Sequence, residues 1–347
     1  MRRFIDKLLI RKWIPDSLIR KNIRKRLKNK LQYEEVLFNK LHSQKDKKLI
    51  QELIESPIAI NTQNANEQHY EVPAEFFQLV LGDWLKYSCG YWENESNLDE
   101  SEIRMLDLYL ARAKIIDAED ILDLGCGWGS FSLYAASRFP GKNFTAVSNS
   151  NSQKKFIIEK AKILNIKNLK VITTDINSFH PTNKYDRVIS IEMFEHMRNY
   201  QELFNRIHQW LRPDGKLFVH IFTHRKYTYK FDVVDDSDWM AKYFFTGGMM
   251  PGKNFLFHFS KGFSTEKQWE INGMHYSKTL EAWLNQMDDK IDLIIPIFKE
   301  SYGKEYPKFV AYWRIFFMAC SETFAMNEGH EWQVHHYLFN KKAKSSS

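Results

Sequence analysis

Cysteine is scarce in this chain of 347 residues, which contains only three. Cys89, Cys126 and Cys320 stand far apart, so they make neither a disulfide framework nor a zinc cluster. No apolar run approaches the roughly 18 residues that a membrane-spanning helix requires. The basic N-terminus also lacks the apolar stretch of a secretory signal. We therefore predict a cytoplasmic protein without disulfides or a bound metal.

Basic charge is concentrated at the N-terminus. Residues 1–48 hold 16 Lys or Arg against 5 Asp or Glu, a net charge of +11, whereas the whole chain carries +7. The rest of the chain is therefore mildly acidic. No aromatic interleaving or known reader motif accompanies these charges, so we expect no nucleic-acid partner.

The N-terminal extension, residues 1–55, is predicted to be helical. Its apolar residues form a narrow stripe at i, i+4 spacing, which leaves two interpretations open. Such a helix could lie on an anionic membrane surface. It could also dock on the protein's own body or on the second subunit of a homodimer, and the narrowness of the stripe favours docking. The stripe consists of Leu18, Ile19, Ile23, Leu27 and Leu31.

Strand-like and helical segments alternate in the middle of the chain. This order is typical of an α/β fold in which helices cover both faces of a parallel sheet. Ligands of such sheets bind at the carboxyl ends of the strands. The predicted strands are residues 120–124, 143–147, 169–173, 187–191 and 216–222, and helical segments cover residues 153–164 and 200–211.

We divide the chain after residue 55 into three segments by their composition. Residues 56–222 are predicted to form the α/β core with its leading helices. Residues 223–330 are rich in aromatic side chains, and we interpret them as a lid over the site. Residues 331–347 are expected to supply a final strand of the sheet and a tail.

A glycine-rich loop follows the first predicted strand. Residues 121–129 read Ile-Leu-Asp-Leu-Gly-Cys-Gly-Trp-Gly. Gly125, Gly127 and Gly129 allow a sharp turn and a close approach of the backbone to a ligand, because they have no Cβ atom. The helix that follows presents unpaired N–H groups to that ligand. The G-x-G-x-G spacing differs from that of dinucleotide sites. It is the pattern associated with S-adenosylmethionine (SAM) in class I methyltransferases.

The segments after the second and third strands extend this predicted pocket. A generic class I methyltransferase has an acid after the second strand to hold the ribose hydroxyls, but this chain has residues 148–153, Ser-Asn-Ser-Asn-Ser-Gln. Ser148 and Gln153 can donate and accept hydrogen bonds in its place. Asp175 follows the third strand, where it can accept from the adenine amino group while Ile176 covers the ring. A helix cap is the alternative role for Asp175.

At these residues the sequence resembles the cyclopropane fatty acid synthase superfamily of methyltransferases, from about residue 70 to the C-terminus. The resemblance implies a class I Rossmann-like fold with a seven-stranded, mostly parallel sheet. It also implies SAM as cofactor and S-adenosylhomocysteine as product. The motifs that carry it are His69-Tyr70-Glu71, residues 87–92, the glycine loop, Ser148-x-Ser150-x-x-Gln153 and Phe194-Glu195-His196.

The same resemblance implies which residues bind SAM. They are Tyr87, Ser88, Asp123, Gly125, Cys126, Gly127, Gly129, Ser148, Asn149, Gln153, Asp175 and Ile176.

Three ionisable residues follow the fourth predicted strand. If a helix or turn begins there, Glu192 and His196 share a face and Glu195 lies beside them. An amine acceptor is mostly protonated at neutral pH and must lose a proton before it can attack a methyl group. Carboxylates attract the ammonium, and a Glu–His pair can take the proton. We therefore predict catalytic roles for these three, with a capped helix start bearing surface acids as the alternative.

Two branches of the superfamily use this region differently. The lipid branch methylates or cyclopropanates an acyl double bond of a phospholipid and holds bicarbonate as a base. The other branch, typified by coclaurine N-methyltransferase, methylates small amines with a Glu/His set. Glu192 stands where the lipid enzymes have a small residue. Tyr70 and Glu71 match positions at which the amine branch contacts its substrate.

Other positions resemble the lipid branch. Cys89, Glu195, His220 and Tyr276 match the residues that hold bicarbonate there, and Tyr276 is the most telling because the amine branch tends to have Phe. Cys320 resembles a cysteine once proposed as a nucleophile. Direct displacement from SAM needs no enzyme nucleophile, so we expect Cys320 to pack in the core.

The favoured hypothesis is N-methylation of a small amine, in which Glu195 and His196 handle the proton and Glu192 steers the ammonium. The alternative is methylation or cyclopropanation of unsaturated phospholipids, with Cys89, His220 and Tyr276 around bicarbonate and residues 1–48 on the membrane. A third hypothesis is a non-catalytic, membrane-associated scaffold. The intact glycine loop and the acid/base set argue against it.

Overall fold

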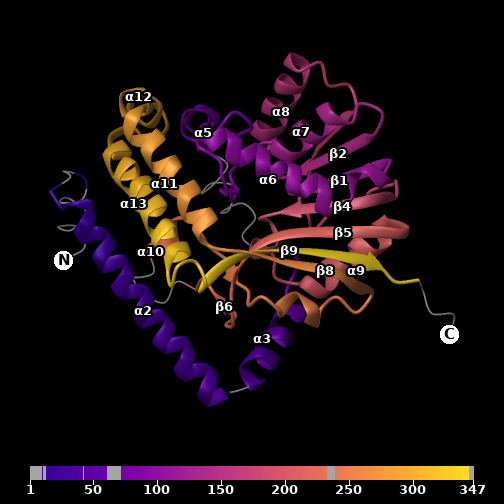
Figure 1. Ribbon diagram of the computed structural model, residues 1–347, viewed down its shortest axis with the longest axis horizontal. Coiled ribbons are helices and arrows are strands. Elements are labelled where there is room, and N and C mark those ends of the chain that lie inside the picture. The colour runs from indigo at the N-terminus through magenta and orange to yellow at the C-terminus, as the bar shows by residue number, and fades with distance from the viewer. Residues whose placement is uncertain (1–9, 11–12, 42, 61–71, 233–238, 344–347) are drawn as a thin grey trace.

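A seven-stranded sheet forms the centre of the molecule, with strand order β3-β2-β1-β4-β5-β9-β8 (Figure 1). The first five strands are parallel, and β9 runs antiparallel between β5 and β8. This arrangement confirms the predicted fold class. The strands are β1 (Asp120–Leu124), β2 (Asn143–Ser148), β3 (Leu169–Thr173), β4 (Tyr185–Ile191), β5 (Leu211–His224), β8 (Phe263–Ile271) and β9 (Trp332–Lys341).

The computed structural model describes residues 10, 13–41, 43–60, 72–232 and 239–343. Tyr70 and Glu71, predicted to contact the acceptor, lie outside these residues. Among the helices it describes, none combines the length and the apolar character needed to cross a bilayer.

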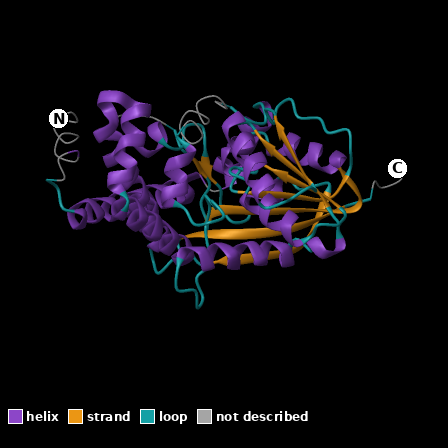
Figure 2. Ribbon diagram, turned by 90° about the horizontal axis from the view of Figure 1, so that it is seen from above, coloured by secondary structure: helices purple, strands orange, loops and turns teal. Residues whose placement is uncertain are grey.

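Both faces of the sheet are covered, so the central strands β1 and β4 are almost continuously buried. Successive side chains of a strand point to opposite faces. Ile121 of β1 therefore joins one core with α6 and α7, whereas Leu122 joins a second core with α3 and α9. Helices accordingly lie on both sides of the strands in Figure 2. The helices are α3 (Ser43–Glu55), α5 (Ala74–Val80), α6 (Leu98–Arg112), α7 (Ser130–Arg138), α8 (Asn151–Ile163) and α9 (Tyr200–Trp210).

A second group of helices stands beyond one end of the sheet (Figures 1 and 2). It belongs to the segment predicted as a lid, residues 223–330. One part of that prediction is wrong, because β8 lies within the segment and is an edge strand of the main sheet, paired with β9. The other elements of this predicted lid are β6 (Tyr229–Lys230), α10 (Trp239–Tyr243), β7 (Met249–Met250), α11 (Met274–Asp289), α12 (Ile291–Tyr302) and α13 (Tyr306–Ala325).

The N-terminal helix α2 (Asp16–Leu41) runs alongside α13 and packs on the body of the protein (Figure 1). The stripe residues Ile19, Ile23, Leu27 and Leu31 contact the main core, so the body covers the surface that a bilayer would otherwise bind. Leu18 does not share this face and is 56% exposed.

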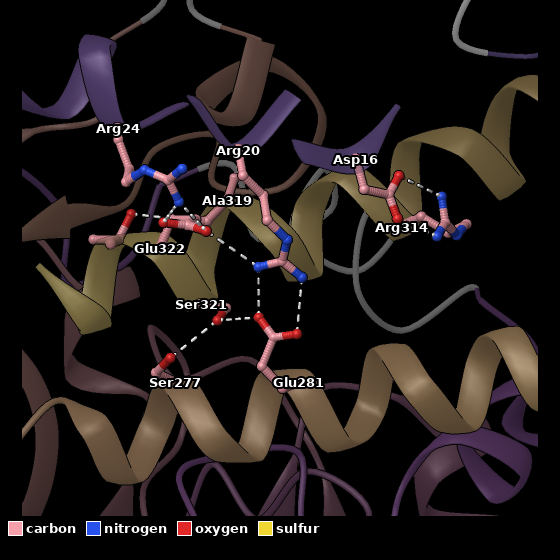
Figure 3. Close-up of polar contacts among 10 residues, drawn as sticks. Asp16, Arg20, Arg24, Ser277, Glu281, Arg314, Ala319, Ser321 and Glu322 are labelled. Atoms are coloured by element: carbon pink, nitrogen blue, oxygen red, sulfur yellow. Dashed lines mark hydrogen bonds and ion pairs between the residues drawn. The ribbon is translucent and has the colours of Figure 1, made fainter. Parts of the chain in front are cut away.

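Ion pairs fix α2 against the lid helices, as Figure 3 shows. Arg20 forms a two-pronged pair with Glu281 of α11, at 2.7 and 2.8 Å. Arg24 binds both carboxylate oxygens of Glu322 of α13, at 2.9 and 2.8 Å. Asp16, in the first turn of α2, accepts from Arg314 at 2.9 Å. Part of the basic charge of the extension is therefore neutralised by the acidic body.

Candidate active site

The glycine loop begins where β1 ends and leads into α7. All three glycines have positive φ angles: 81° at Gly125, 53° at Gly127 and 80° at Gly129. A Cβ atom on Gly129 would lie 2.6 Å from Cγ1 of Ile157, so this glycine permits close packing of α8. A Cβ atom on Gly127 would meet no atom within 4 Å. Gly127 therefore faces open space in which a ligand can approach the backbone.

That space is part of a cavity of about 1220 Å³. The cavity extends from the glycine loop, past the end of β4, to the lid helices and α2. Of the residues predicted for the cofactor, it is lined by Tyr87, Ser88, Asp123, Gly125, Cys126, Gly127 and Gln153. The other described residues of that prediction, which are not among its lining, are Gly129, Ser148, Asn149, Asp175 and Ile176.

Ser148 stands behind Gln153 and orients it. The hydroxyl of Ser148 donates to Oε1 of Gln153 at 2.6 Å. The amide nitrogen of Gln153 is buried and has no hydrogen-bond partner among the described residues. A buried donor of this kind is costly unless a ligand accepts from it. Ser148 therefore orients the amide of a residue that lines the cavity, without itself being part of the lining.

Asp175 begins a turn, and no helix follows it, so neither the helix cap nor adenine binding is shown. One of its carboxylate oxygens accepts from the backbone N–H of Asn177 at 2.7 Å. Asp123 is different, because it is buried at the cavity wall and accepts from Ser132 at 2.6 Å. Burial raises the pKa of Asp123 to about 7 despite this hydrogen bond.

Glu192 lies just past β4 in a left-handed backbone conformation, with a φ angle of 46°. The register of β4 and β5 pairs Ile191 with His220, which places the next residue against this imidazole. One oxygen of the Glu192 carboxylate accepts from the backbone N–H of Cys89 and from Nε2 of His220, both at 3.0 Å. Its other oxygen accepts from the phenol of Tyr276 at 2.5 Å.

The residues predicted to hold bicarbonate are therefore brought together, but their donors surround a carboxylate that the protein itself supplies. Cys89 contributes its backbone N–H, while its own thiol donates to the carbonyl of Gly90. The donors of Cys89, His220 and Tyr276 are therefore already used by the Glu192 carboxylate.

Glu195 and His196 lie in a short 3-10 turn, Phe194–His196, and both line the cavity with Glu192. Glu195 is 1% exposed, and its Oε2 atom has no hydrogen-bond partner among the described residues. Burial, and then the nearby charge of Glu192, raise the pKa of Glu195 well above its ordinary value. A carboxyl group with a raised pKa is a stronger base when it is deprotonated.

The outer part of the cavity has an aromatic wall from the lid and a wall from α2 that mixes apolar and polar side chains. The lid residues are Tyr229, Phe231, Phe245, Tyr312 and Phe316, and the α2 residues are Leu18, Ile19, Asn22, Ile23, Arg26, Leu27, Asn29 and Lys30.

Comparisons with known proteins agree with this geometry. The family model for mycolic acid cyclopropane synthetase matches residues 59–334. The (S)-coclaurine N-methyltransferase of Thalictrum flavum subsp. glaucum is 39% identical over 344 residues, which cover 95% of this chain and 93% of the relative. The chain belongs to the cyclopropane synthetase family of SAM-dependent methyltransferases.

Two further relatives define its position in the family. A solved structure of coclaurine N-methyltransferase bound to N-methylheliamine and S-adenosylhomocysteine is 36% identical. It superposes with a TM-score of 0.91, over 97% of this chain and 99% of that one. The cyclopropane-fatty-acyl-phospholipid synthase of Escherichia coli (strain K12) is 26% identical over 270 residues, which cover 77% of this chain and 66% of the relative. The predicted superfamily and branch are thereby confirmed.

The cavity of this methyltransferase fits SAM on its own geometry. Gly127 leaves room for the ligand, and the unpartnered amide nitrogen of Gln153 can donate to a ribose hydroxyl. Ser130, at the start of α7, has a buried hydroxyl without a hydrogen-bond partner among the described residues and also lines the cavity. When bound, SAM supplies an electrophilic methyl group on a positively charged sulfur.

The cysteines of this methyltransferase are not activated. Burial raises the pKa of the Cys89, Cys126 and Cys320 thiols well above the usual range. Cys320 lines the cavity and packs in the main core. A nucleophilic cysteine requires a lowered pKa, so none of the three thiols has the character of a nucleophile.

Four residues of the site region were not found from the sequence. Lys86 is 1% exposed and donates to Ser88 and to the carbonyl of Cys89, both at 2.6 Å. Tyr109 of α6 and His336 of β9 both contact Nδ1 of His220, and Arg112 of α6 contacts His336 behind it. In the sequence, His335-His336 lies within a pattern typical of a buried strand. This pattern does not show which strand pairs with it, so the contact between His336 and His220 could not be predicted.

Proposed function

We propose that this protein transfers the methyl group of SAM to the nitrogen of a small amine. The observation that carries the proposal is the carboxylate of Glu192, held by Cys89, His220 and Tyr276 in the cavity wall. A fixed negative charge attracts an ammonium. The names of its relatives agree, since these are coclaurine and pavine N-methyltransferases at 38–39% identity.

Glu195 and His196 are proposed to handle the proton. The amine must be neutral to attack, and Glu195 has a raised pKa and an unpartnered oxygen in the cavity. His196 lines the same cavity one residue later. General-base catalysis of this kind is worth roughly 10²–10⁴-fold. The aromatic wall contributes cation–π attraction for the ammonium, about 0.5–2 kcal/mol per favourable contact.

Labelled SAM tests the acceptor class directly. The full-length protein is incubated with labelled SAM and either a panel of secondary and tertiary amines or unsaturated phospholipid vesicles. We expect label in one or more amines. Label in lipid with loss of the double bond would overturn the proposal in favour of the lipid alternative. If calorimetry shows no SAM binding, the scaffold hypothesis replaces both.

The location and assembly of the protein stay predictions. We propose a cytoplasmic enzyme, which its three free cysteines support. Peripheral membrane contact through residues 1–48 predicts that deletion of this segment abolishes vesicle binding, whereas docking of α2 predicts no vesicle binding by the intact chain. A homodimer is tested by light scattering.

A further inference from the structure

Two buried histidines stand side by side behind Glu192. The register of β5 and β9 pairs His220 with His336, and both side chains are fully buried. Nδ1 of His220 lies 2.8 Å from Nε2 of His336. Each neutral imidazole has one donor and one acceptor. The direction of this hydrogen bond therefore decides whether Nε2 of His220, the nitrogen that faces Glu192, carries a proton.

Arg112 sets that direction from the end of α6. Its guanidinium lies 2.8 Å from Nδ1 of His336, and a guanidinium only donates. Nδ1 of His336 must accept, so its proton is on Nε2 and is donated to Nδ1 of His220. The proton of His220 is then on Nε2, which donates to Glu192 at 3.0 Å. Burial lowers the pKa of His220 to about 4 and that of His336 well below its ordinary value, which keeps both rings neutral.

A second chain of donors reaches the same atom of His220. Lys86 donates to Ser88 at 2.6 Å, and the Ser88 hydroxyl hydrogen-bonds to the phenol oxygen of Tyr109. The Tyr109 hydroxyl lies 2.9 Å from Nδ1 of His220. An ammonium, like a guanidinium, only donates. The Arg112 chain alone fixes the direction, and the Lys86 chain is compatible with it, because the Ser88 and Tyr109 hydroxyls can each accept from one side and donate to the other. The lone pair on Nδ1 of His220 is then shared between Nε2–H of His336 and the Tyr109 hydroxyl.

We propose that Arg112 is a positioning residue that acts through His336 and His220 on the Glu192 carboxylate. The proposal rests on the proposed role of Glu192 in amine methylation. Neither Arg112 nor His336 lines the cavity, so Arg112 has no part in substrate contact. In the opposite tautomer, His220 would turn a lone pair towards the carboxylate and repel it. Hydrogen bonds in a buried chain also polarise one another, which strengthens the last donor to Glu192.

The role of Arg112 in packing must be separated from its role as a donor. Its guanidinium lies 5.1 Å from the ring centre of Trp269 on β8. Arg112→Met keeps an unbranched stem beside this ring and removes every donor. Arg112→Lys restores a cationic donor. Arg104→Met is the matched control, because Arg104 is on the same helix, half-exposed, and pairs with Glu93 and Glu95 away from the histidines.

Nitrogen NMR of the full-length chain labelled with ¹⁵N-histidine reads the tautomers without reference to activity. In the wild type we expect His220 and His336 both to carry the proton on Nε2. In Arg112→Met we expect the His336 signals to shift towards protonation at Nδ1. With an accepted amine, its kcat should fall on the order of tenfold, as for loss of a supporting hydrogen bond. Its amine KM and SAM Kd should stay within about twofold of wild type. Arg112→Lys should restore most of the turnover.

Three results would overturn the proposal. The first is a wild-type His336 protonated at Nδ1. The second is an Arg112→Met protein with normal turnover, and the third is an equal loss in Arg104→Met. If no amine is methylated, the proposed function fails first. In that case the NMR measurement alone tests the positioning proposal. It fails if the imidazole signals do not show the expected tautomers or do not respond to Arg112→Met.

Discussion

The phenol of Tyr276 donates a 2.5 Å hydrogen bond to the Glu192 carboxylate, across the space between α11 and the end of β4. Tyr276 was the residue that most resembled the lipid branch, and this contact shows how the same hydroxyl serves an enzyme with a built-in carboxylate. We expect Tyr276→Phe to lower kcat on the order of tenfold, because a hydrogen bond to a charged group is worth about 1.5–3 kcal/mol. SAM affinity measured by calorimetry should not change. Tyr306→Phe, on a half-buried tyrosine of α13, is the control, and equal kcat values for both variants would contradict this role.

Glu195→Gln removes the proposed base while keeping the shape of the side chain. We expect kcat to fall by roughly 10²–10⁴-fold, with SAM affinity within severalfold of wild type. The base acts only when it is deprotonated, and burial raises its pKa. As the pH is lowered, the wild type should therefore lose activity at a higher pH than an enzyme whose base is a glutamate of ordinary pKa. The Glu195→Gln variant should not show this loss. A large loss of SAM binding would instead assign Glu195 to the cofactor.

Asp123 predicts a specific dependence of stability on pH. Its pKa is raised from 3.8 to about 7 by burial, so the folded state favours the protonated form. This contribution to stability is complete below about pH 4 and is lost as the pH rises through about 7. Asp123→Asn lacks the titration. Its free energy of unfolding should rise relative to wild type by about 2–4 kcal/mol between pH 4 and pH 8 in ligand-free urea titrations. Parallel curves for the two proteins would contradict the raised pKa.

Two glycines of the loop should respond differently to alanine. Gly127→Ala adds a methyl group to open cavity space at a φ of 53°. The backbone cost is about 1–2 kcal/mol, and SAM affinity should fall because the methyl group occupies the ligand's space. Gly129→Ala drives the same group to 2.6 Å from Ile157. It should lower the urea midpoint more than Gly127→Ala does. Wild-type SAM affinity in Gly127→Ala would show that the ligand does not approach this residue.

The Arg20–Glu281 ion pair joins α2 to α11, and α2 lines the outer cavity. We therefore predict that α2 is part of the acceptor site. A double-mutant cycle with Arg20→Met and Glu281→Gln should give a coupling energy of about 1 kcal/mol, since both side chains are partly exposed. Loosening α2 should raise the amine KM severalfold and leave SAM affinity unchanged, because α2 lines the outer cavity. Lys21→Met, exposed on the same helix, is the control. An unchanged amine KM in both Arg20→Met and Glu281→Gln would remove α2 from the site.

The cofactor and the approximate fold were determined by local sequence. The glycines at residues 125, 127 and 129 predicted a sharp turn, and the structure has positive φ angles at all three positions. The alternation of strands and helices predicted the parallel strands β1 to β5, because both signals depend on neighbours a few residues apart. The position of β8 was missed. Its burial pattern is mixed, and it lies among aromatic turns that are typical of a lid.

Only the tertiary structure decided how the acceptor end is built. The sequence placed Glu192, Glu195 and His196 together because they are adjacent along the chain. The structure brought Cys89, His220 and Tyr276, which are distant in sequence, to the Glu192 carboxylate. It also turned the apolar stripe of α2 onto the body and put His336 behind His220 through the β5–β9 register. Contacts between segments 28 to 116 residues apart depend on packing and register, and no local pattern in the chain records them.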